Sequence, residues 1–597
     1  MGEYGSATPP RYVGPEPVNV TDDMFDNAAR RPDHPGFARN TGTGWRPVSC
    51  AEFADQVTRL AAGLLAEGIQ PGDRIALMSS TSYEWALCDF AIMAVGAVTV
   101  PIYETSSPAQ VEWILSDSGA VAGFVQDDRL HTVVRRAAPP GVRKIWRMDG
   151  DRLARLTAAG AAVPAAAVAE RRRAVTAGQL ATIVYTSGTT GRPKGCRISH
   201  RSLVSEVRNL MRADRVSDTV LTDRSSLLLF LPLAHIFARV VQLAVVHRGA
   251  RLGHVGDLRA VPAELLAFRP TILLAVPRVF EKLYHTAQQA AAARRLGRLF
   301  RAAERTAVGY SEALDAGVPG AGLRLRRWLY DRLVYARLRG ATGGRVSYAV
   351  CAGAPLDARL GHFLRGAGIT VLEGYGLTET TAGVTLNLPG AQRIGTVGRP
   401  LPGCAVRIAD DGEVLVKSAW NFDGYWGDDR ATADAFTADG WLRTGDLGSL
   451  ADGYLTITGR KKEVIVTSGG KNIAPAYYEQ RLAGHWLIDH CVVIGNNRPY
   501  VGALITLDPA AFSEWKRKHG KPEPATVAEI RDDPALLATV QAAVDEVNQT
   551  VSRAEAIRRF RIVPGEFAVG DELTPTQKVR RERVLAKHAD EVAALYR

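Results

Sequence analysis

The sequence predicts an α/β protein with a large N-terminal domain and a small C-terminal domain. From about residue 50 to residue 369, Ala/Leu-rich helical stretches alternate with short runs of Val and Ile. This alternation is typical of mixed or mainly parallel sheets flanked by helices. The 597 residues also exceed the ~250–300 residues at which single cores stop growing, so more than one domain is expected.

The elements of the first half can be predicted in order. A helix is expected over residues 51–68, "AEFADQVTRLAAGLLAEG", which "GIQPGD" ends with glycine and proline. The apolar run 90–103, "FAIMAVGAVTVPIY", is shorter than the ~18 residues of a membrane span, so it predicts a buried helix leading into a strand. "LATIV" before Tyr185 and "PTILLAVP" at 270–277 predict further buried strands.

A basic helical insert is predicted over about residues 285–344. It is rich in Ala, Leu and Arg, with Trp328 and Tyr330 among the arginines. An ordinary pair of surface helices explains the pattern. Peripheral contact with a membrane is the alternative, because basic amphipathic helices also bind lipid interfaces.

The pattern changes after Ile394, where short strands and turns predict a small β-rich subdomain. "DDG" at 410–412 and "ADG" at 451–453 are typical of hairpin turns. Beyond "GRKKEVIVTSGGKNI" the pattern is mixed α+β. We place the boundary near Arg460, which predicts an N-terminal domain over 1–459 and a mobile C-terminal domain over 460–597.

Composition narrows the class of protein. With 46% hydrophobic and 23% charged residues the chain resembles a soluble globular protein. Its net charge of +12 would suit nucleic acid, an anionic membrane or polyanionic small molecules. No zinc-finger spacing or RNP-type motif occurs, so nucleic acid is not predicted as a partner. Six cysteines without C-x-x-C spacing, and a start that lacks a secretory pattern, predict a cytoplasmic protein.

The loop "YTSGTTGRPKG" at 185–195 predicts a phosphate site. Its glycines allow close approach of the backbone, and its hydroxyls and Lys194 supply donors and positive charge. It is not a Walker loop, because Arg192 and Pro193 separate Gly191 from Lys194.

Later segments add groups suited to a nucleotide. In "EGYGLTETT" at 373–381, Tyr375 offers a face for stacking and Glu379 a carboxylate for Mg²⁺. "GWLRTGDLG" at 440–448 predicts Asp446 in a tight glycine turn, where it could accept hydrogen bonds from ribose hydroxyls. "GRKKEVIVTSGGKNIAP" adds a cationic cluster, and "GDELTPTQKVRRERV" contains Lys578. Each segment alone is commonly a turn or a solvated lysine, but their joint occurrence in this order indicates one site.

This ordered set resembles the adenylate-forming superfamily of acyl-CoA synthetases, acyl ligases, luciferases and nonribosomal-peptide adenylation domains. "YTSGTTGRPKG" is similar to its phosphate loop, "YGLTET" to its adenine and magnesium motif and "TGD" to its ribose motif. "GRKKEVI" resembles its hinge and "PTQKVRR" its C-terminal lysine motif. Three further parts of the chain resemble the long-chain fatty acyl-CoA synthetase branch: the segment 100–120, the run "LPLAHIFARV" at 231–240, and the helical insert.

The resemblance implies two half-reactions that use a fatty acid, ATP, Mg²⁺ and coenzyme A. A carboxylate attacks the α-phosphate and releases pyrophosphate, and the thiol of coenzyme A then takes the acyl group and releases AMP. Lys578 would bridge the carboxylate and the α-phosphate, Glu379 and Thr186 would hold Mg²⁺, and Asp446 and Arg460 would hold the ribose. The remaining nucleotide-binding residues that the resemblance implies are Ser187, Gly188, Thr189, Thr190, Gly191, Lys194, Gly353, Gly374, Tyr375, Gly376 and Thr378.

The second half-reaction is expected to use a different arrangement of the C-terminal domain. The family rotates this domain about a hinge residue, which corresponds to Lys462. Gly470 and Lys471 would then line the pantetheine tunnel. His235 resembles the family's histidine at the acyl pocket, although a structural role is the alternative.

Three other functions stay open at this point. A fatty acyl-AMP ligase would pass the adenylate to a carrier protein, and an aryl or other carboxylate–CoA ligase would use a different acid. A non-catalytic acyl or nucleotide binding protein is the third, although it has no need of Glu379, Asp446 and Lys578 together. Oligomeric state is not predicted.

Overall fold

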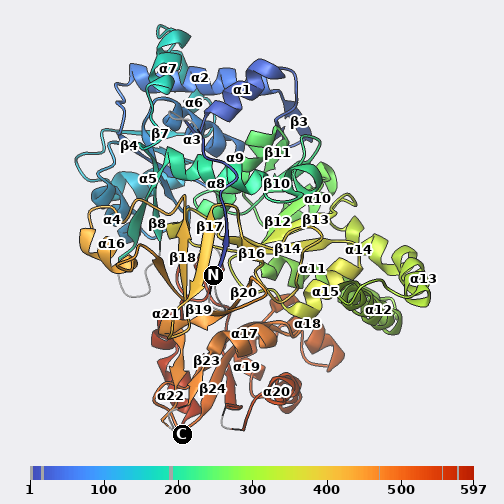
Figure 1. Cartoon of the computed structure of the whole chain (residues 1–597). Coiled ribbons are helices and arrows are strands. Elements are labelled where there is room, and N and C mark those ends of the chain that lie inside the picture. The colour runs from blue at the N-terminus through green and yellow to red at the C-terminus, as the bar shows by residue number, and fades with distance from the viewer. Residues whose placement is uncertain (1–4, 15–18, 187–191, 469–470, 554, 575–576) are drawn as a thin grey trace. The chain divides into compact units, whose positions relative to one another are not determined.

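The computed structural model describes residues 5–14, 19–186, 192–468, 471–553, 555–574 and 577–597. The chain forms two compact units (Figure 1). The first comprises Met1–Arg407, Leu415–Thr444 and Leu450–Leu455. The second comprises Ile408–Val414, Gly445–Ser449 and Thr456–Arg597.

The first sheet of the first unit has the order β7-β6-β4-β5-β8-β9 within the described residues. Its neighbouring strands are parallel, except that β8 and β9 form an antiparallel pair. The strands are β4 (Arg74–Met78), β5 (Val98–Ile102), β6 (Ala122–Val125), β7 (Lys144–Arg147), β8 (Leu180–Thr186) and β9 (Lys194–Ser199). The helices along this part of the chain are α1 (Asp22–Arg30), α2 (Cys50–Ala66), α3 (Tyr83–Ala94), α4 (Pro108–Ser118), α5 (Asp128–Ala137), α6 (Arg152–Ala159) and α7 (Ala165–Arg173).

Local sequence explains why these elements start where they do. Ser49 accepts a hydrogen bond from the backbone N–H of Glu52 at the start of α2, and Ser107 caps α4 in the same way. The predicted helix over 51–68 is α2, and the predicted helix and strand within 90–103 are the end of α3 and β5. Both predictions are confirmed.

The second sheet has the order β16-β15-β14-β13-β12-β10-β11-β2-β3 within the described residues. It is parallel from β14 to β2 and antiparallel at both edges. Its strands are β2 (Phe37–Asn40), β3 (Trp45–Val48), β10 (Ser226–Leu229), β11 (Arg251–His254), β12 (Ile272–Ala275), β13 (Tyr348–Cys351), β14 (Thr370–Tyr375), β15 (Thr385–Leu386) and β16 (Arg399–Pro400). The helices between them include α8 (His200–Met211), the π-helix η1 (Val216–Val220), α9 (Ile236–Arg248), α10 (Val261–Phe268), α15 (Ala358–Gly366) and the 3₁₀ turn η3 (Thr378–Thr380).

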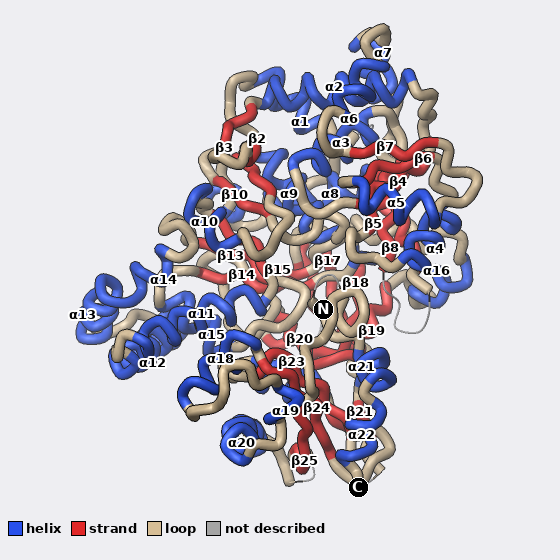
Figure 2. The backbone as a smooth tube through the Cα atoms, turned by 180° about the vertical axis from the view of Figure 1, so that it is seen from behind, coloured by secondary structure: helices blue, strands red, loops and turns tan. Residues whose placement is uncertain are grey.

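The helical insert packs against this sheet. Its elements are α11 (Pro277–Ala293), α12 (Gly297–Asp315), α13 (Ala321–Tyr330), the π-helix η2 (Asp331–Tyr335) and α14 (Ala336–Gly340). Helix α11 lies beside β14 in both views, and α12 and α13 lie farther out (Figures 1 and 2). Phe280, Phe300 and Tyr335 are buried there with residues of β13 and β14. The region is helical as predicted, but it begins at Pro277 and contains more than a helical pair.

A third sheet has the order β1-β17-β18-β19-β20 within the described residues. The boundaries between the two units fall inside β17, β18, β19 and β20. The predicted turns at 410–412 and 451–453 join β17 to β18 and β19 to β20, as expected. The strands are β1 (Gly5–Thr8), β17 (Cys404–Ile408), β18 (Glu413–Ser418), β19 (Leu442–Ala451) and β20 (Tyr454–Arg460), with α16 (Asp429–Ala435) between β18 and β19.

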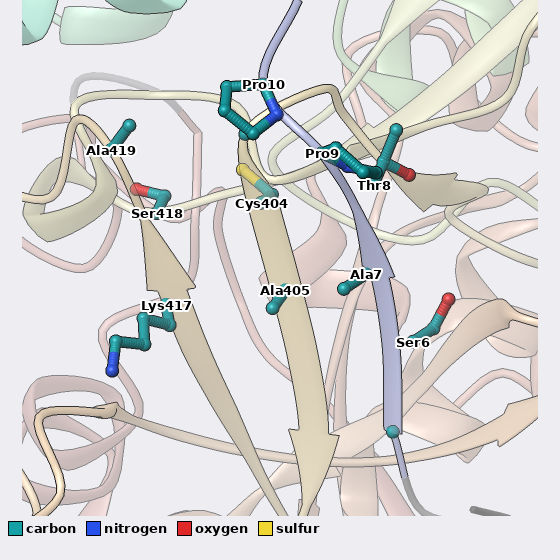
Figure 3. A pocket seen from close by; sticks show the side chains of 12 residues that line it. Ser6, Ala7, Thr8, Pro9, Pro10, Cys404, Ala405, Lys417, Ser418 and Ala419 are labelled. Carbon is teal, nitrogen blue, oxygen red and sulfur yellow. The ribbon is translucent and has the colours of Figure 1, made fainter. Parts of the chain in front are cut away.

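A surface groove of about 680 Å³ follows β1, the start of β17 and the end of β18 (Figure 3). Side chains along it include Thr8, Cys404 and Ser418. Among the described residues that line the groove, none belongs to the predicted site.

The second unit is mixed α+β, as predicted. Its larger sheet within the described residues has the order β23-β24-β25, with β23 antiparallel and β25 parallel to β24, and β21 and β22 form a separate antiparallel pair. Trp515, Leu536 and Val540 are buried in its core. Its elements are η4 (Lys461–Glu463), β21 (Ile465–Val466), β22 (Asn472–Ile473), α17 (Pro475–Ala483), β23 (Ile488–Ile494), β24 (Val501–Leu507), α18 (Pro509–Lys518), α19 (Val527–Ile530), α20 (Pro534–Asn548), β25 (Ile557–Ile562), α21 (Arg581–Lys587) and α22 (Ala589–Leu595).

Two further features of the described residues concern membrane-spanning helices and the state of the cysteines. Every helix there is too short or too polar to cross a bilayer. All six cysteines are buried with free thiols.

Candidate active site

The predicted phosphate loop connects the antiparallel strands β8 and β9. Thr186 pairs with Lys194 in the register of the two strands, so the residues at the two ends of the loop lie side by side. The predicted phosphate-binding residues Ser187, Gly188, Thr189, Thr190 and Gly191 lie outside the described residues.

Aromatic side chains fix both ends of this hairpin. The indole N–H of Trp113 donates to the backbone oxygen of Pro193 at 2.8 Å, and the Arg192 guanidinium lies 4.6 Å from the centre of the Trp113 ring. The Tyr185 hydroxyl donates to the Asp117 carboxylate at 2.5 Å. Helix α4, which carries Trp113 and Asp117, therefore holds the strands on both sides of the loop.

A segment from much later in the chain lies against β9. The backbone N–H of Trp426 donates to the oxygen of Gly195 at 2.7 Å, and the N–H of Arg197 donates to the oxygen of Gly424 at 3.0 Å. A Cβ at Gly195 would lie 2.7 Å from Ile183 and 3.3 Å from Trp426. Glycine at this position thus permits the close approach of the later segment.

This segment brings a tyrosine to the predicted magnesium ligand. The Tyr425 hydroxyl donates to Oε1 of Glu379 at 2.8 Å. Burial and the Glu379 carboxylate both raise the pKa of Tyr425, so it stays a neutral donor. Glu379 itself lies in η3, and its backbone oxygen accepts from the N–H of Phe422 at 2.9 Å. Glu379 is therefore held by hydrogen bonds to both its carboxylate and its backbone oxygen.

Lys194 lies beside the same tyrosine. Its ammonium group is 5.2 Å from the centre of the Tyr425 ring and 3.5 Å from the Asp428 carboxylate. Both Lys194 and Asp428 are partly exposed, at 46% and 42% of their side chains. An exposed pair of this kind is weak, so the ammonium group can turn towards a phosphate at low cost.

Thr186 and Glu379 supply hard oxygen donors, which suit Mg²⁺. The buried thiol of Cys196 lies near both, since it is hydrogen-bonded to the Thr186 side chain and its pKa is raised by burial and by the charge of Glu379. Among the described residues, no cluster of three or more His, Cys, Asp or Glu could hold a metal by itself. Mg²⁺ commonly takes one or two carboxylates plus substrate phosphates. The residues therefore fit an ion that binds together with a nucleotide.

The predicted adenine motif lies at the end of β14. Tyr375 is the last residue of the strand, Gly374 precedes it and Thr378 begins η3. A Cβ at Gly376 would lie 1.4 Å from the backbone oxygen of Ala382, so this position requires glycine. Gly353, with φ of 92°, lies in the loop that follows the neighbouring strand β13.

A buried carboxyl group joins these two segments. Oε2 of Glu373 in β14 accepts from the backbone N–H of Leu356 at 3.3 Å. Burial raises the pKa of Glu373 to about 7, and backbone donors from Leu356 and Gly395 oppose the shift. Glu373 thus connects the loop after β13 to the strand that carries Tyr375.

His235 caps α9. Its Nδ1 accepts from the backbone N–H of Phe237 at 3.2 Å, so Nε2 carries the hydrogen in the neutral ring. The residue is half-buried. This hydrogen bond fits the structural alternative, and the role at the acyl pocket stays a prediction.

The second unit contains the predicted ribose residues. Nε of Arg460 lies 3.0 Å from Oδ1 of Asp446, whose side chain is buried. The prediction of Asp446 in a tight glycine turn is wrong: it lies inside the ten-residue strand β19, directly after Gly445 with φ of 70°. The strand continues past the positive φ of Gly445, because the backbone N–H of Gly445 donates a hydrogen bond to Oε1 of Glu413 at 3.0 Å.

The predicted catalytic lysine lies in the same unit. Surrounding protein atoms lower the pKa of the Lys578 ammonium group although the residue is exposed, and the charge of Arg460 lowers it further. Asp446 and Glu463 oppose this shift, so all three charged groups lie near Lys578. Lys462 lies in η4, and exposed Lys471 pairs with Glu555 at 3.1 Å. Gly470 lies outside the described residues.

Sequence analysis missed Tyr425, Trp426 and Asp428. The available signal was "DGYWGDD" at 423–429, an aromatic pair between glycines and acids. What it could not show is the backbone pairing with β9, which places Tyr425 opposite Cys196.

With this geometry described, comparisons with known proteins identify the family. A model described as AMP-binding enzyme matches residues 24–426, and one described as AMP-binding enzyme C-terminal domain matches residues 462–597. The chain belongs to the AMP-binding enzyme family, and the resemblance inferred from the motifs is confirmed.

Particular relatives extend along the whole chain. The long-chain-fatty-acid–CoA ligase FadD15 of Mycobacterium bovis is 48% identical over 598 residues, covering 99% of both chains. Among solved structures, the adenylation domain of a carboxylate reductase from Mycobacterium chelonae is 22% identical, with a TM-score of 0.74 over 97% of this chain and 91% of that one. The corresponding domain from Segniliparus rugosus, solved with AMP and a co-purified carboxylic acid, is 21% identical, with a TM-score of 0.74 over 97% and 94%. These two structures confirm the predicted fold.

Proposed function

We propose that this protein activates a long-chain fatty acid with ATP as an acyl-adenylate and transfers the acyl group to coenzyme A. The observation that carries the proposal is the 48% identity, along the full length, to an enzyme named as a long-chain-fatty-acid–CoA ligase. The arrangement of Thr186, Lys194 and Glu379 supports it, because it combines phosphate donors with a metal ligand at one hairpin.

In the first half-reaction, a carboxylate oxygen bonds to the α-phosphorus of ATP and the bond to pyrophosphate breaks. Two anions meet in this step, so positive charge and oriented donors lower the barrier. Lys194 and the loop over 187–191 would bind the β- and γ-phosphates, and Lys578 would bridge the carboxylate and the α-phosphate. Mg²⁺, when bound by Glu379 and Thr186, supplies charge neutralisation on the phosphates.

The nucleoside would be held by groups that the sequence predicts. Tyr375 would stack on adenine, with Gly353, Gly374, Gly376 and Thr378 around it. Asp446 would accept hydrogen bonds from the ribose hydroxyls, and Arg460 orients the Asp446 carboxylate through its 3.0 Å contact. Nε2 of His235 would face the acyl carboxylate.

In the second half-reaction, the sulfur of coenzyme A bonds to the acyl carbon, the thiol loses its proton and AMP leaves. We propose that residues 460–597 act as a mobile domain that turns about Lys462 between the two steps. Gly470 and Lys471 would then contact the pantetheine arm.

Two further aspects belong to the proposal. We expect the protein to work in the cytoplasm and to touch a membrane peripherally through the helical insert over 285–344. This contact would give it access to long-chain acids, which partition into lipid.

The test is pyrophosphate release by purified protein with ATP, Mg²⁺ and fatty acids from short to long, each with and without coenzyme A. We expect long-chain acyl-CoA and AMP, identified by mass. Adenylate that coenzyme A cannot discharge would indicate an acyl-AMP ligase, and a preference for aryl acids would indicate another carboxylate–CoA ligase. No pyrophosphate release with any of the acids would indicate a non-catalytic binding protein.

Lys578→Ala separates catalysis from binding within the same experiment. It should abolish pyrophosphate release and leave ATP binding intact, because the lysine is proposed to act on the reacting groups. Lys518→Ala, which removes an exposed lysine paired with Glu514, is the matched control and should remain active.

A further inference from the structure

Helix α13 and the π-helix η2 leave an apolar face in solvent. Leu325, Trp328, Leu329 and Leu333 are 59%, 48%, 47% and 48% exposed. Their spacing of i, i+3, i+4 and i+8 places them along one side of the helix. In α13 no residue is buried. Large apolar side chains that gather on one exposed face usually contact a partner.

The opposite side of this segment is anchored to the rest of the insert. Tyr335 is buried, and its hydroxyl donates to the backbone oxygen of Ala303 in α12 at 2.6 Å. Arg327 donates from Nε to the oxygen of Gly366 at 2.8 Å. Leu338 is buried in the core of the insert. The exposed face is therefore presented by a fixed helix.

Positive charge surrounds the apolar face. Residues 321–340 contain six arginines and one acid, Asp331, a net charge of +5 from 6 minus 1. That acid is already paired, since Arg339 donates to both of its oxygens at 2.7 and 2.9 Å and holds the pKa of Asp331 below its usual value. The exposed arginines of this segment are Arg324, Arg326, Arg332 and Arg337.

Tryptophan and arginine also interact within the face. The Arg332 guanidinium lies 4.3 Å from the centre of the Trp328 ring. Figures 1 and 2 both show α13 at the outer end of the insert, beyond α12. Apolar side chains flanked by arginines, with tryptophan among them, are typical of helices that lie in the headgroup region of an anionic bilayer.

We infer that the face formed by Leu325, Trp328, Leu329 and Leu333 docks on an anionic lipid surface, with the flanking arginines on the phosphates. This deepens the membrane contact proposed above and rests on it, but it does not depend on which acid or acceptor the enzyme uses. Lipid is favoured over a protein partner because the apolar stripe is narrow and is bordered by cations that match lipid phosphates. A second copy of this chain is a poorer match, because it would bring a like-charged arginine face.

The test is flotation of the full-length protein with vesicles, without substrates. Vesicles of phosphatidylcholine mixed with phosphatidylglycerol should carry the protein, vesicles of phosphatidylcholine alone should carry much less, and added salt should release it. The triple variant Leu325→Ser, Trp328→Ser and Leu329→Ser should bind the anionic vesicles at least about tenfold more weakly. The triple variant Arg324→Gln, Arg326→Gln and Arg332→Gln should lose the preference for anionic lipid.

The matched control is Leu258→Ser with Leu266→Ser, two leucines that are 54% and 55% exposed elsewhere on the first unit. It should bind vesicles as the natural protein does. The midpoint of thermal unfolding should be unchanged in all variants, which shows that they fold. This control requires no acid or acceptor, so it separates the inference from the proposed function.

Equal vesicle binding by the apolar variant and the natural protein, or no binding by either, would overturn the inference. Sedimentation that shows a dimer lost in the apolar variant would also overturn it, and would assign the face to a second copy of the chain.

Discussion

Tyr425 controls the surroundings of two charged groups at the predicted phosphate site. Its hydroxyl donates to Glu379, and its ring lies beside the Lys194 ammonium group. A donor that holds a metal-binding carboxylate in place lowers the cost of ordering it when the ion arrives. The side chain would thus act on a Mg²⁺ ion at Glu379 through the carboxylate, without touching the ion.

Tyr425→Phe should raise the Mg²⁺ concentration for half-maximal activity about tenfold, because it deletes the donor and keeps the ring. The measurement is a Mg²⁺ titration of pyrophosphate release at saturating ATP. Calorimetry should show weaker binding of ATP with Mg²⁺, while binding of ATP in chelator should be unchanged.

Tyr454→Phe is the control for that substitution, since it deletes a tyrosine hydroxyl bonded at 2.8 Å to the backbone oxygen of Ala391. A similar Mg²⁺ shift in both variants would show that Tyr425 has only a general structural role.

At the scale of elements, β13, β14 and the loops that follow them carry the predicted adenine-binding residues. The two strands are parallel neighbours, so their carboxyl ends meet at one edge of the sheet. The buried Glu373 carboxyl group joins them by accepting from Leu356. Its raised pKa means that the folded protein holds this proton more tightly than the unfolded chain does.

The pH dependence of stability follows from this shift. The unfolded pKa of a glutamate is about 4.3 and that of Glu373 in the fold is about 7. Its contribution is therefore fully present below pH of about 4.3 and is lost as the pH rises to about 7, by at most about 4 kcal/mol. The Glu373→Gln variant has no titratable group at this position. The urea concentration at the midpoint of its unfolding should therefore fall less between pH 5 and 7 than that of the natural protein.

Glu566→Gln, at an exposed glutamate, should keep the natural pH dependence of the urea midpoint. Equal slopes for Glu373→Gln and the natural protein would contradict the assignment of this proton to Glu373.

At the scale of the whole molecule, the predicted catalytic and nucleotide-binding residues are divided between the two compact units. Thr186, Lys194 and Glu379 belong to the first, whereas Asp446, Arg460 and Lys578 belong to the second. The proposed mechanism divides the chain at Lys462 instead, so that Asp446 would stay with the adenylate while the residues after the hinge exchange Lys578 for the groups of the second step.

Lys462→Pro tests the hinge. Proline restricts φ to about −65°, so the backbone turn that the second half-reaction needs should be blocked. We expect the first-turnover burst of pyrophosphate to persist and acyl-CoA formation to fall at least about tenfold.

Lys462→Ala removes the side chain and leaves the backbone free, so it should keep both steps. A proportional loss of both steps in the proline variant would argue against a hinge at this residue and for a general disturbance of η4.

Much of the fold and of the site chemistry follows from the sequence alone. The helix α2, the buried strand β8 and the turns at 410–412 and 451–453 were predictable because each depends on contacts between near neighbours in the chain. Glu379, Lys194 and Lys578 could be predicted as site residues because their motifs are short and continuous, and their roles stay predictions. The assignment of these motifs to one enzyme family came from their order.

Tertiary structure alone decided which side chains surround those groups. Tyr425 and Asp428 reach Glu379 and Lys194 because 423–426 pairs with β9, more than two hundred residues earlier. Asp446 lies in a strand, although its glycine neighbour is typical of a turn, because Glu413 satisfies the backbone there. The apolar face of α13 is exposed because Tyr335 and Leu338 occupy the core on the other side. Periodicity and propensity describe neighbours along the chain, whereas these placements depend on long-range pairing and on which face a core leaves uncovered.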